Sequence, residues 1–383
     1  MIPNETAISE EAVADLVDRA RRDVEGEGAV LPSAGLAVAH EGRLVCDEVL
    51  GAAGPDARFN LFSVTKALVA AAIWRLISDR RLDPADRVID HVPEFGTNGK
   101  GVVTVEQLLT HTAGFPHAPL GPPDWYDRDA RLRRFADWRL NWEPGSQMEY
   151  HPSSAHWVLA EIIERLEGQD YRDAIFERVC EPLGLHRLRV GATHKHPDDW
   201  TDVPPIQIVG TAPDPATVEA VLGIVDLDFG EITDEITLRY NDRQVRDLGV
   251  PGGGGIGTAA DVALFYQALL QNPEGLWDPA VLADGTGHIR GTFDDPLLGV
   301  AANRTLGLIV AGDDGNAPRR GFGKTVSGRA FGHLGLGAQV AWADPATGIS
   351  FCFVSNGHEI DLLAQGRRIH SLNNRAGALL TPR

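Results

Sequence analysis

The alternation of apolar and polar residues predicts secondary structure first near the N-terminus. Apolar residues recur at helical spacing from Val13 to Val24, and Ser9 stands where a helix cap is expected. Two strand-like runs, 34–40 and 43–49, then flank Glu41-Gly42, a pattern typical of a β-hairpin. A further stretch, 63–77, is apolar on nearly every side, and it predicts a buried helix.

The rest of the chain is helical in its middle and strand-like near its end. Helical patterns separated by Pro-, Gly- and Asp-rich loops occupy about 84–271, and strand-like runs return at 305–311, 338–343 and 349–355 before a last helical stretch, 360–380. Because strands lie at both ends, we expect an α+β fold with one antiparallel sheet, flanked by the N- and C-terminal helices, and an inserted helical domain. The predicted division is a discontinuous sheet domain, 1–83 with 290–383, and an insertion, 84–289.

Composition and charge narrow the function classes. The 383 residues are 43% hydrophobic, and the longest purely apolar run, 67–74, is far shorter than the roughly 20 residues of a membrane span. The stretch 1–24 lacks the basic and apolar regions of a secretory signal. A formal net charge of −19 argues against nucleic acid or an anionic membrane as a partner. We expect a cytoplasmic protein that acts on a small molecule, while nothing in the sequence indicates its oligomeric state.

Cysteine and histidine spacing gives no sign of a cofactor. Cys46, Cys180 and Cys352 are far apart, and we interpret them as buried thiols of a reducing compartment. His194-Lys195-His196 has the spacing of two metal ligands, but a third ligand is not evident. The glycines at 252–255 lack the Lys-Ser/Thr of a phosphate loop and suit a tight backbone passage better. We expect neither a metal nor an organic cofactor.

The first candidate for catalysis is Ser63-Val64-Thr65-Lys66. Helical residues three apart share a face, so the hydroxyl of Ser63 and the amine of Lys66 can meet. A serine hydroxyl attacks a carbonyl only when a base takes its proton. A lysine can be that base if burial lowers its pKa from about 10.4 toward neutrality. The spacing therefore favours a nucleophile and its base.

In its context this motif resembles the S-x-x-K of the serine β-lactamase and penicillin-binding-protein-like family, especially the class C β-lactamases and the esterases related to them. The resemblance runs over about residues 10–380, through the strings at 82–95, 104–114 and 251–258. It implies an active site at the junction of the two domains and acyl transfer through a seryl ester. His111, inside Leu-Leu-Thr-His-Thr-Ala-Gly, we interpret as structural, with a hydrogen-bonding role in a turn.

The second motif of that family, Tyr-x-Asn, is matched at Tyr150 but altered at Pro152. A phenol beside a cationic lysine is pulled toward phenolate, so Tyr150 can shuttle protons between the nucleophile and the leaving group. A proline side chain offers no hydrogen bond. The amide contact to substrate is therefore lost, or it is taken by Ser153 or Ser154.

The third motif, Lys-Thr-Gly, has two candidates. Lys324-Thr325-Val326 matches in letters but lacks the glycine, whereas His333-Leu334-Gly335 directly precedes the 338–355 hairpin, as the motif does in the family. We choose the second, which is the His-x-Gly variant of related esterases and peptidases, and Gly335 permits close backbone approach. The resemblance further implies an oxyanion hole made by the N–H groups of Ser63 and Leu336. Trp125 and Tyr126, in a Pro-rich loop, are candidates for the wall of a substrate pocket.

Together these residues predict a serine hydrolase that cleaves small esters or amides through an acyl-serine intermediate. Whether Lys66 or Tyr150 is the first base stays open. A histidine at 333 and a proline at 152 predict that neutral substrates are preferred to β-lactams. The alternatives are a β-lactamase or D-aminopeptidase-type hydrolase, an acyltransferase and, from another class, a catalytically dead binding protein with the penicillin-recognising fold. No Gly-x-Ser-x-Gly occurs, which argues against an α/β-hydrolase.

Overall fold

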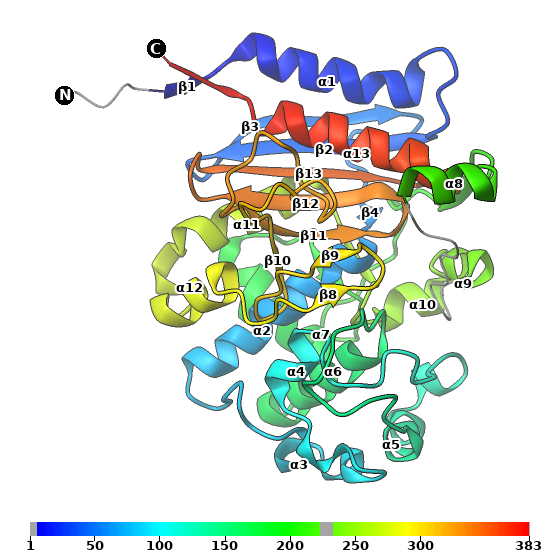
Figure 1. Cartoon of the computed structure of the whole chain (residues 1–383), viewed down its shortest axis with the longest axis vertical. Helices are drawn as coiled ribbons and strands as arrows, with labels where there is room; N and C mark the ends of the chain where they lie inside the picture. Colours follow the sequence, from blue (N-terminus) through cyan, green and yellow to red (C-terminus); the bar gives the residue numbers. More distant parts are fainter. Residues whose placement is uncertain (1–5, 223–232, 383) are drawn as a thin grey trace.

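The largest sheet of the protein is antiparallel and combines strands from the two ends of the chain (Figure 1). A computed structural model describes residues 6–222 and 233–382, so 1–5, 223–232 and 383, which fall within the predicted domains, lie outside the described residues. The strand order is β10-β11-β12-β13-β2-β3. β13 pairs with β2 from Ile349 opposite His40 to Ser355 opposite Ala34, which confirms the expected α+β fold.

The strands of this sheet and the helices on its faces have the following bounds. The strands are β2 (Ser33–His40), β3 (Arg43–Gly51), β10 (Ile309–Val310), β11 (Phe331–Gly335), β12 (Gln339–Asp344) and β13 (Ile349–Ser355). The helices are α1 (Glu10–Glu25), α11 (Ala259–Gln271) and α13 (Leu362–Ala376). The predicted hairpin and terminal helices are therefore confirmed, whereas the strand expected at 305–311 is reduced to two residues.

Both faces of the sheet are covered, which explains why its central strands are apolar along almost their whole length. Successive side chains of a strand point to opposite faces. Leu36 and Val38 of β2 accordingly pack in one core with α1 and α13, whereas Ala37 and Ala39 pack in the other core with α11. Figure 1 shows α1 and α13 together on the outer face.

Helix α11 lies in the range predicted for the insertion, but it packs against β2, β12 and β13. The sequence pattern could not reveal this, because helical periodicity does not say which layer a helix joins. The division into 1–83 with 290–383 and 84–289 stays a prediction, and α11 belongs to the sheet side of the molecule by its contacts.

A central helix, α2 (Lys66–Ser78), follows a short 3-10 turn, η1 (Phe62–Thr65), and is buried along most of its length. Two tryptophan side chains hold it in place: Trp74 Nε1 donates to Leu306 O at 2.9 Å, and Trp277 Nε1 donates to Ala71 O at 3.0 Å. The turn and the start of α2 therefore have a fixed position between the sheet and the helical half of the molecule (Figure 1).

The remaining elements surround α2 or lie at the edges of the molecule. The helices are α3 (Val88–His91), α4 (Val105–Leu109), α5 (Arg128–Asp137), α6 (Ser154–Glu167), α7 (Tyr171–Ile175), α8 (Pro215–Leu222), α9 (Asp234–Arg239), α10 (Arg243–Leu248) and α12 (Pro279–Gly287). The strands are β1 (Thr6–Ile8), β4 (Phe59–Asn60), β5 (Arg189–Val190), β6 (Gln207–Val209), β7 (Gly255–Gly257), β8 (Asp294–Asp295), β9 (Val300–Ala301), β14 (Gly357–Glu359) and β15 (Leu380–Pro382).

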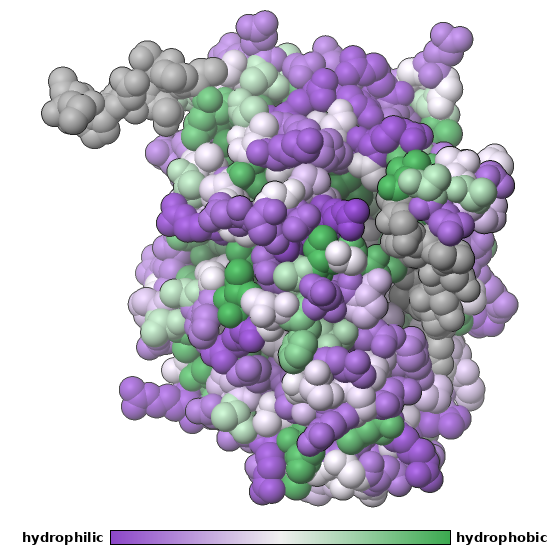
Figure 2. All heavy atoms as spheres, in the orientation of Figure 1, coloured by the Kyte–Doolittle hydropathy of each residue, from purple (hydrophilic) through white to green (hydrophobic). Residues whose placement is uncertain are grey.

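The surface is mainly hydrophilic on the face shown in Figure 2, with small apolar areas between the polar ones. Among the described helices, none combines the length and the apolar character that crossing a bilayer requires. Cys46, Cys180 and Cys352 are buried free thiols, as the sequence predicted.

Candidate active site

The structure brings Ser63, Lys66 and Tyr150 together. Ser63 lies on the η1 turn rather than on the long helix, and Lys66 is the first residue of α2. Tyr150 comes from the loop before α6, and its Oη donates a hydrogen bond to Ser63 Oγ at 2.8 Å, while Lys66 Nζ lies 3.1 Å from the same oxygen. Phe62 has a φ of +44°, an unfavourable conformation for a residue other than glycine, so the chain bends sharply just before the serine.

Lys66 is fully buried, and its Nζ lies 2.8 Å from Pro152 O and 2.6 Å from Gly252 O. Burial and the positive charge of Arg304 hold the pKa of Lys66 well below its ordinary value. A neutral amine has two N–H groups and one lone pair. Since two carbonyls accept the N–H groups, the lone pair is left for the hydroxyl proton of Ser63.

Tyr150 is a neutral phenol in this environment. Burial raises its pKa to about 12, and the opposing effects of the hydrogen bond to Ser63 and the charge of Arg304 are smaller. The sequence argument that a nearby cation pulls this phenol toward phenolate is therefore outweighed by desolvation. At rest Tyr150 donates to Ser63 Oγ, which leaves the serine proton free to point at Lys66.

His111 fixes the loop that carries Tyr150. Its Nδ1 accepts from the backbone N–H of His151 at 3.1 Å, and its carbonyl accepts from the backbone N–H of Glu149 at 3.2 Å. The His111 ring also lies against the Tyr150 ring, with 4.7 Å between their centroids. The structure thus gives His111 the hydrogen-bonding role that was expected of it.

Two glycines are required by close backbone packing around the nucleophile turn. A Cβ on Gly255 would lie 2.6 Å from Thr65 Oγ1, and a Cβ on Gly335 would lie 2.6 Å from Leu61 O. The segment 252–255 is therefore a tight passage beside η1, and Gly335 lets β11 approach the turn that carries Ser63.

His333 is buried beside Tyr150. Its Nδ1–H donates to Leu334 O at 2.6 Å, so Nε2 carries the lone pair and accepts from Arg304 Nη1 at 3.4 Å. The His333 and Tyr150 ring centroids are 6.2 Å apart. Burial, together with the charges of Arg304 and Lys66, keeps the pKa of His333 well below its ordinary value, so the ring is neutral.

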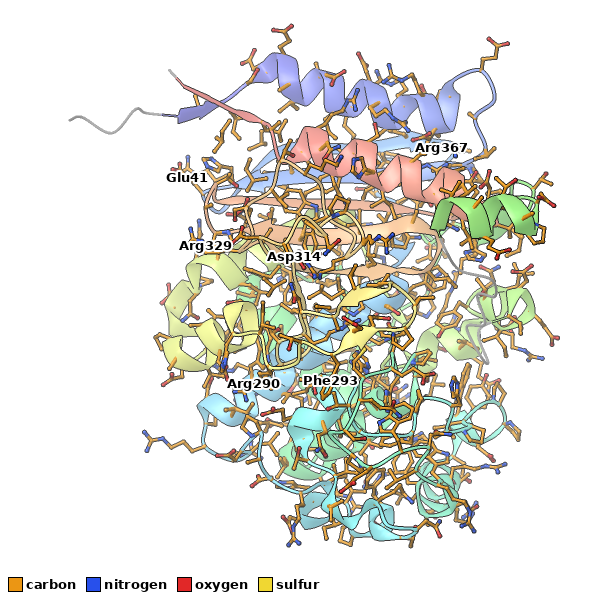
Figure 3. The ribbon with its side chains drawn as sticks, in the orientation of Figure 1. Glu41, Arg290, Phe293, Asp314, Arg329 and Arg367 are labelled. Atoms are coloured by element: carbon orange, nitrogen blue, oxygen red, sulfur yellow. The ribbon has the colours of Figure 1, made fainter. Side chains whose placement is uncertain are left out.

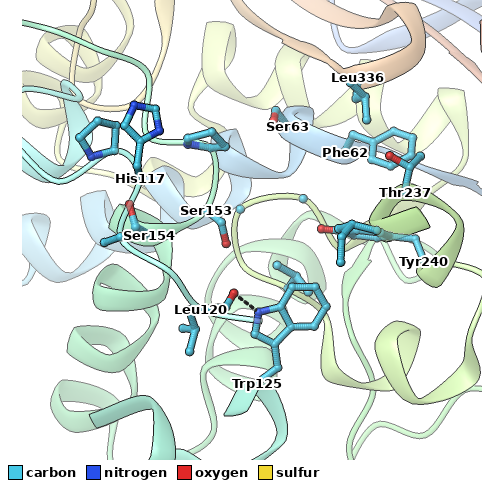
Figure 4. A pocket seen from close by; sticks show the side chains of 17 residues that line it. Phe62, Ser63, His117, Leu120, Trp125, Ser153, Ser154, Thr237, Tyr240 and Leu336 are labelled. Carbon is cyan, nitrogen blue, oxygen red and sulfur yellow. Dashed lines mark hydrogen bonds between the residues drawn. The ribbon is translucent and has the colours of Figure 1, made fainter. Parts of the chain in front are cut away.

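A cavity of about 160 Å³ opens beside Ser63 (Figure 4). Most of its wall is apolar, and the aromatic side chains of Phe62, Trp125 and Tyr240 contribute to it. Trp125 is held there by a hydrogen bond from its Nε1 to Leu120 O at 2.6 Å. The other lining residues are Ser63, Pro116, His117, Ala118, Leu120, Pro152, Ser153, Ser154, Ile236, Thr237, Val250, Gly252, Gly253 and Leu336.

Of the two aromatic residues proposed for the pocket wall, Trp125 lines this cavity and Tyr126 does not. Tyr126 points instead into a separate surface depression beside Arg128 and Tyr171. The two neighbours lie on one short 3-10 turn and therefore face different directions. Tyr240, at the end of α9, lines the cavity, but no motif in the sequence singled it out.

The two serines that follow Pro152 differ in what their hydroxyl groups contact. Ser154 Oγ donates to Phe115 O at 3.1 Å, so it holds the start of α6. Ser153 Oγ is buried and has no hydrogen-bond partner among the described residues. Ser153 also lines the cavity, so of these two hydroxyls it is the one without a described protein partner there.

The residues rejected on sequence grounds lie elsewhere. Lys195 and His196 both contact Glu177, the latter with 3.0 Å between His196 Nε2 and Glu177 Oε1. Within residues 6–222 and 233–382, no group of three or more His, Cys, Asp or Glu side chains is arranged to hold a metal ion. Lys324 is exposed.

Comparisons with known proteins agree with this geometry. The sequence model of the family described as Beta-lactamase matches residues 16–372. The esterase/beta-lactamase LipL of Mycobacterium tuberculosis is 26% identical over 317 residues, which are 77% of this chain and 68% of LipL. Esterase EstB of Burkholderia gladioli is 30% identical over 281 residues, which are 63% of this chain and 68% of EstB. The crystal structure of a penicillin-binding protein homolog from Caulobacter crescentus matches with a TM-score of 0.76 at 28% identity, over 97% of this chain and 100% of that one.

Proposed function

The chain belongs to the β-lactamase family and is a serine hydrolase, and we propose that Ser63, Lys66 and Tyr150 carry its reaction. The observation that supports this most is the position of one oxygen. Ser63 Oγ lies 2.8 Å from the Tyr150 phenol and 3.1 Å from the Lys66 amine, at the edge of an apolar cavity. Nucleophile, base and proton donor are thus within hydrogen-bonding reach of each other.

The acylation step follows from these contacts. Ser63 Oγ forms a bond to the substrate carbonyl carbon while its proton passes to Lys66 Nζ. The negative oxygen of the tetrahedral intermediate is stabilised by the N–H groups of Ser63 and Leu336. When the bond to the leaving group breaks, Tyr150 gives that group its proton and regains one from Lys66. The products are the acyl-serine and the protonated leaving group.

Deacylation reverses these roles with water as the nucleophile. Water gives one proton to Lys66 Nζ, relayed through the Tyr150 hydroxyl, as the water oxygen attacks the acyl carbon. The bond between that carbon and Ser63 Oγ then breaks, and Lys66 returns the proton to Ser63 Oγ. The low pKa of Lys66 makes it the base of the first step in this scheme, because a protonated ammonium could not accept the serine proton.

The substrate class we propose is small neutral esters or amides with an apolar acyl group. The cavity beside Ser63 is lined mainly by carbon atoms, and the unpartnered Ser153 hydroxyl offers one hydrogen bond. Arg304 is a permanent cation next to the neutral His333. Arg304 does not line the cavity, however, so the preference for neutral substrates rests on the apolar wall.

A hydrolysis panel tests this proposal. p-Nitrophenyl esters of increasing acyl length, nitrocefin and D-amino-acid amides are compared with wild-type protein and with Ser63→Ala, and the trapped acyl-enzyme is weighed by mass spectrometry. We expect the short esters to be cleaved fastest, with an adduct on Ser63. Faster cleavage of nitrocefin than of every ester would establish the β-lactamase alternative, and an acylated added alcohol among the products would establish the acyltransferase. No turnover and no adduct would indicate the dead binding protein. The cytoplasm stays the proposed compartment.

A further inference from the structure

Arg304 is a buried arginine at the catalytic centre that no sequence motif indicated. Its side chain is 3% exposed. Its backbone is fixed between two segments, because it pairs with Gly291 on one side and with Ile309 of β10 on the other, and Arg290 N–H donates to Arg304 O at 2.8 Å. Arg290 and Phe293 mark the segment that holds it in Figure 3. The backbone that carries the guanidinium is therefore fixed.

The surroundings of this guanidinium contain the catalytic tyrosine but no close carboxylate. Arg304 Cζ lies 5.4 Å from the centroid of the Tyr150 ring, and Nη1 lies 3.4 Å from His333 Nε2. Nε has no hydrogen-bond partner, and among the described residues no Asp or Glu forms an ion pair with Arg304. The buried carboxylate of Asp295 acts on it from a greater distance, while accepting backbone N–H groups of Leu297 and Leu298.

Such an arrangement is unfavourable for stability. A buried cation without a close counterion loses its hydration and gains little in return. Arg320 shows the usual solution in the same protein: it is equally buried, but it donates to Asp314 and to two backbone carbonyls. The position of Arg304 therefore suggests a role other than holding the fold.

On the basis of the function proposed above, we propose that Arg304 is a positioning residue. Its fixed positive charge disfavours the uptake of a proton by Lys66 while Tyr150 keeps its phenol proton. Lys66 Nζ lies 5.0 Å from the Tyr150 ring centroid, and Arg304 Cζ lies 5.4 Å from it, so one phenol ring has two cationic side chains beside it. An arginine does not lose its proton at accessible pH. Its charge therefore makes protonation of Lys66 less favourable and keeps the amine ready to accept the serine proton.

Other ionisable groups also lie around the pair. Burial keeps the histidines neutral and raises the pKa of the neighbouring tyrosine Tyr240. Within the part of the chain that the structure describes, Asp295 is the one carboxylate that acts on the pair. These ionisable groups are His111 after α4, His156 of α6, His333 of β11, Tyr240 at the end of α9 and Asp295 of β8. Arg304 is therefore the permanent positive charge beside the pair, and its effect on Lys66 adds to the larger effect of burial.

The test is the pH dependence of kcat/KM for a neutral ester in wild type, Arg304→Gln and Arg304→Lys. Losing a cation raises the pKa of Lys66, so the acid limb of the Arg304→Gln profile should move upward by about one pH unit, the size expected for a charge within about 10 Å in a partly buried site. At alkaline pH the Gln variant should approach the wild-type rate, and Arg304→Lys should keep the wild-type limb. If Arg304→Gln does not fold, Arg304→Met serves the same purpose.

The control is Arg368→Met, which removes a buried arginine paired with Glu359 on the far side of the sheet. It should lower the melting temperature without moving the acid limb. If kcat/KM of Arg304→Gln reaches a lower plateau but the acid limb of its pH profile does not move, the proposal is overturned, because Arg304 would then have a purely structural role. A raised KM for a carboxylate-bearing substrate alone would also overturn it, because Arg304 would then bind substrate. Mass-spectrometric detection of the Ser63 adduct in wild type tests the proposed function separately.

Discussion

The amine of Lys66 and the hydroxyl of Ser63 are 3.1 Å apart, and no carboxylate among the described residues forms an ion pair with that amine. Burial and a neighbouring positive charge lower the pKa of this amine, which is the proposed base, and two backbone carbonyls accept its N–H groups. Because all these contacts come from the chain itself, they can be altered one at a time.

Removing the nucleophile is the most direct test. Ser63→Ala should lower kcat/KM for the best ester to less than about a thousandth of the wild-type value, because nothing else replaces the attacking oxygen. The acyl adduct should disappear from the mass spectrum while the melting temperature stays close to wild type. Residual turnover above a tenth of wild type would show that another group attacks the substrate.

The proton donor and the base should differ in their pH profiles. Tyr150→Phe removes the hydrogen bond to Ser63 and the donor to the leaving group, so the rate should fall by about 10²–10⁴ at every pH. Its loss should be smaller for esters with good leaving groups, such as p-nitrophenolate, than for amides. An equal loss for both kinds of substrate would argue against Tyr150 as the proton donor. Lys66→Met is the comparison, and it should remove the acid limb of the profile.

The neighbouring serines form a matched pair. Ser153→Ala should alter KM with little change in stability, because its Oγ has no partner among the described residues and lines the cavity. Ser154→Ala should instead cost about 1 kcal/mol of unfolding free energy through its lost hydrogen bond to Phe115 O, with little effect on KM. Steady-state kinetics gives KM, and urea unfolding gives the free energy of unfolding, for both variants. A changed KM in Ser154→Ala together with a lower stability of Ser153→Ala would assign the substrate contact to Ser154.

Acyl-chain selectivity should depend on Trp125 but not on its neighbour. Trp125→Ala enlarges the cavity, so the optimum in a series of p-nitrophenyl esters should move to longer acyl groups. Tyr126→Ala, the control, should leave the optimum unchanged, because Tyr126 faces away from the cavity. An unchanged optimum in both variants would mean that the acyl group binds elsewhere.

The protein should lose stability in mild acid. Burial lowers the pKa of His151 to about 3 and holds those of His111, His156 and His333 well below their ordinary value. Unfolded histidines take up a proton below about pH 6.5, so the stability present above that pH is lost as pH falls toward the folded pKa values. Each histidine contributes a slope of about 1.4 kcal/mol per pH unit.

His156 offers the cleanest measurement of this effect, because neither ring nitrogen has a partner among the described residues. His156→Leu should reduce the slope of unfolding free energy against pH, below pH 6, by about 1.4 kcal/mol per unit. Leu159→Ala provides the control on the same helix, because it removes buried apolar contacts but no titratable group, and it should leave the slope as it is. An unchanged slope in His156→Leu would show that this ring is protonated in the folded state.

The parts of the fold that were predicted correctly depend on local patterns. The β2–β3 hairpin could be inferred because two apolar runs and a Glu-Gly turn are contiguous, and α1 because its cap and apolar stripe lie within one segment. Ser63, Lys66 and Tyr150 could be proposed because their spacing and flanking strings match a family pattern, and the structure places their side chains together. These features need no knowledge of distant contacts.

Arg304 and Tyr240 could not be found in this way. Arg304 lies between strands of only two residues, and its position depends on pairing with Gly291 and Ile309 rather than on its own neighbours in sequence. Tyr240 reaches the cavity because α9 packs beside the nucleophile turn, where its ring lies 5.5 Å from that of Phe62. Burial also reversed the expected effect on the pKa of Tyr150, since desolvation depends on every layer around the residue.

The pairing of β2 with β13 has a consequence for how the protein is made. Ala34 lies opposite Ser355, so β2 is synthesised about 300 residues before the strand that completes its hydrogen bonds. At about 5–20 residues per second, the apolar hairpin waits roughly 15–60 seconds on the ribosome without its partner. The nucleophile turn likewise waits for β11, which borders it. We expect the nascent chain to depend on holding chaperones, and catalytic competence to arise only after the last strands have emerged.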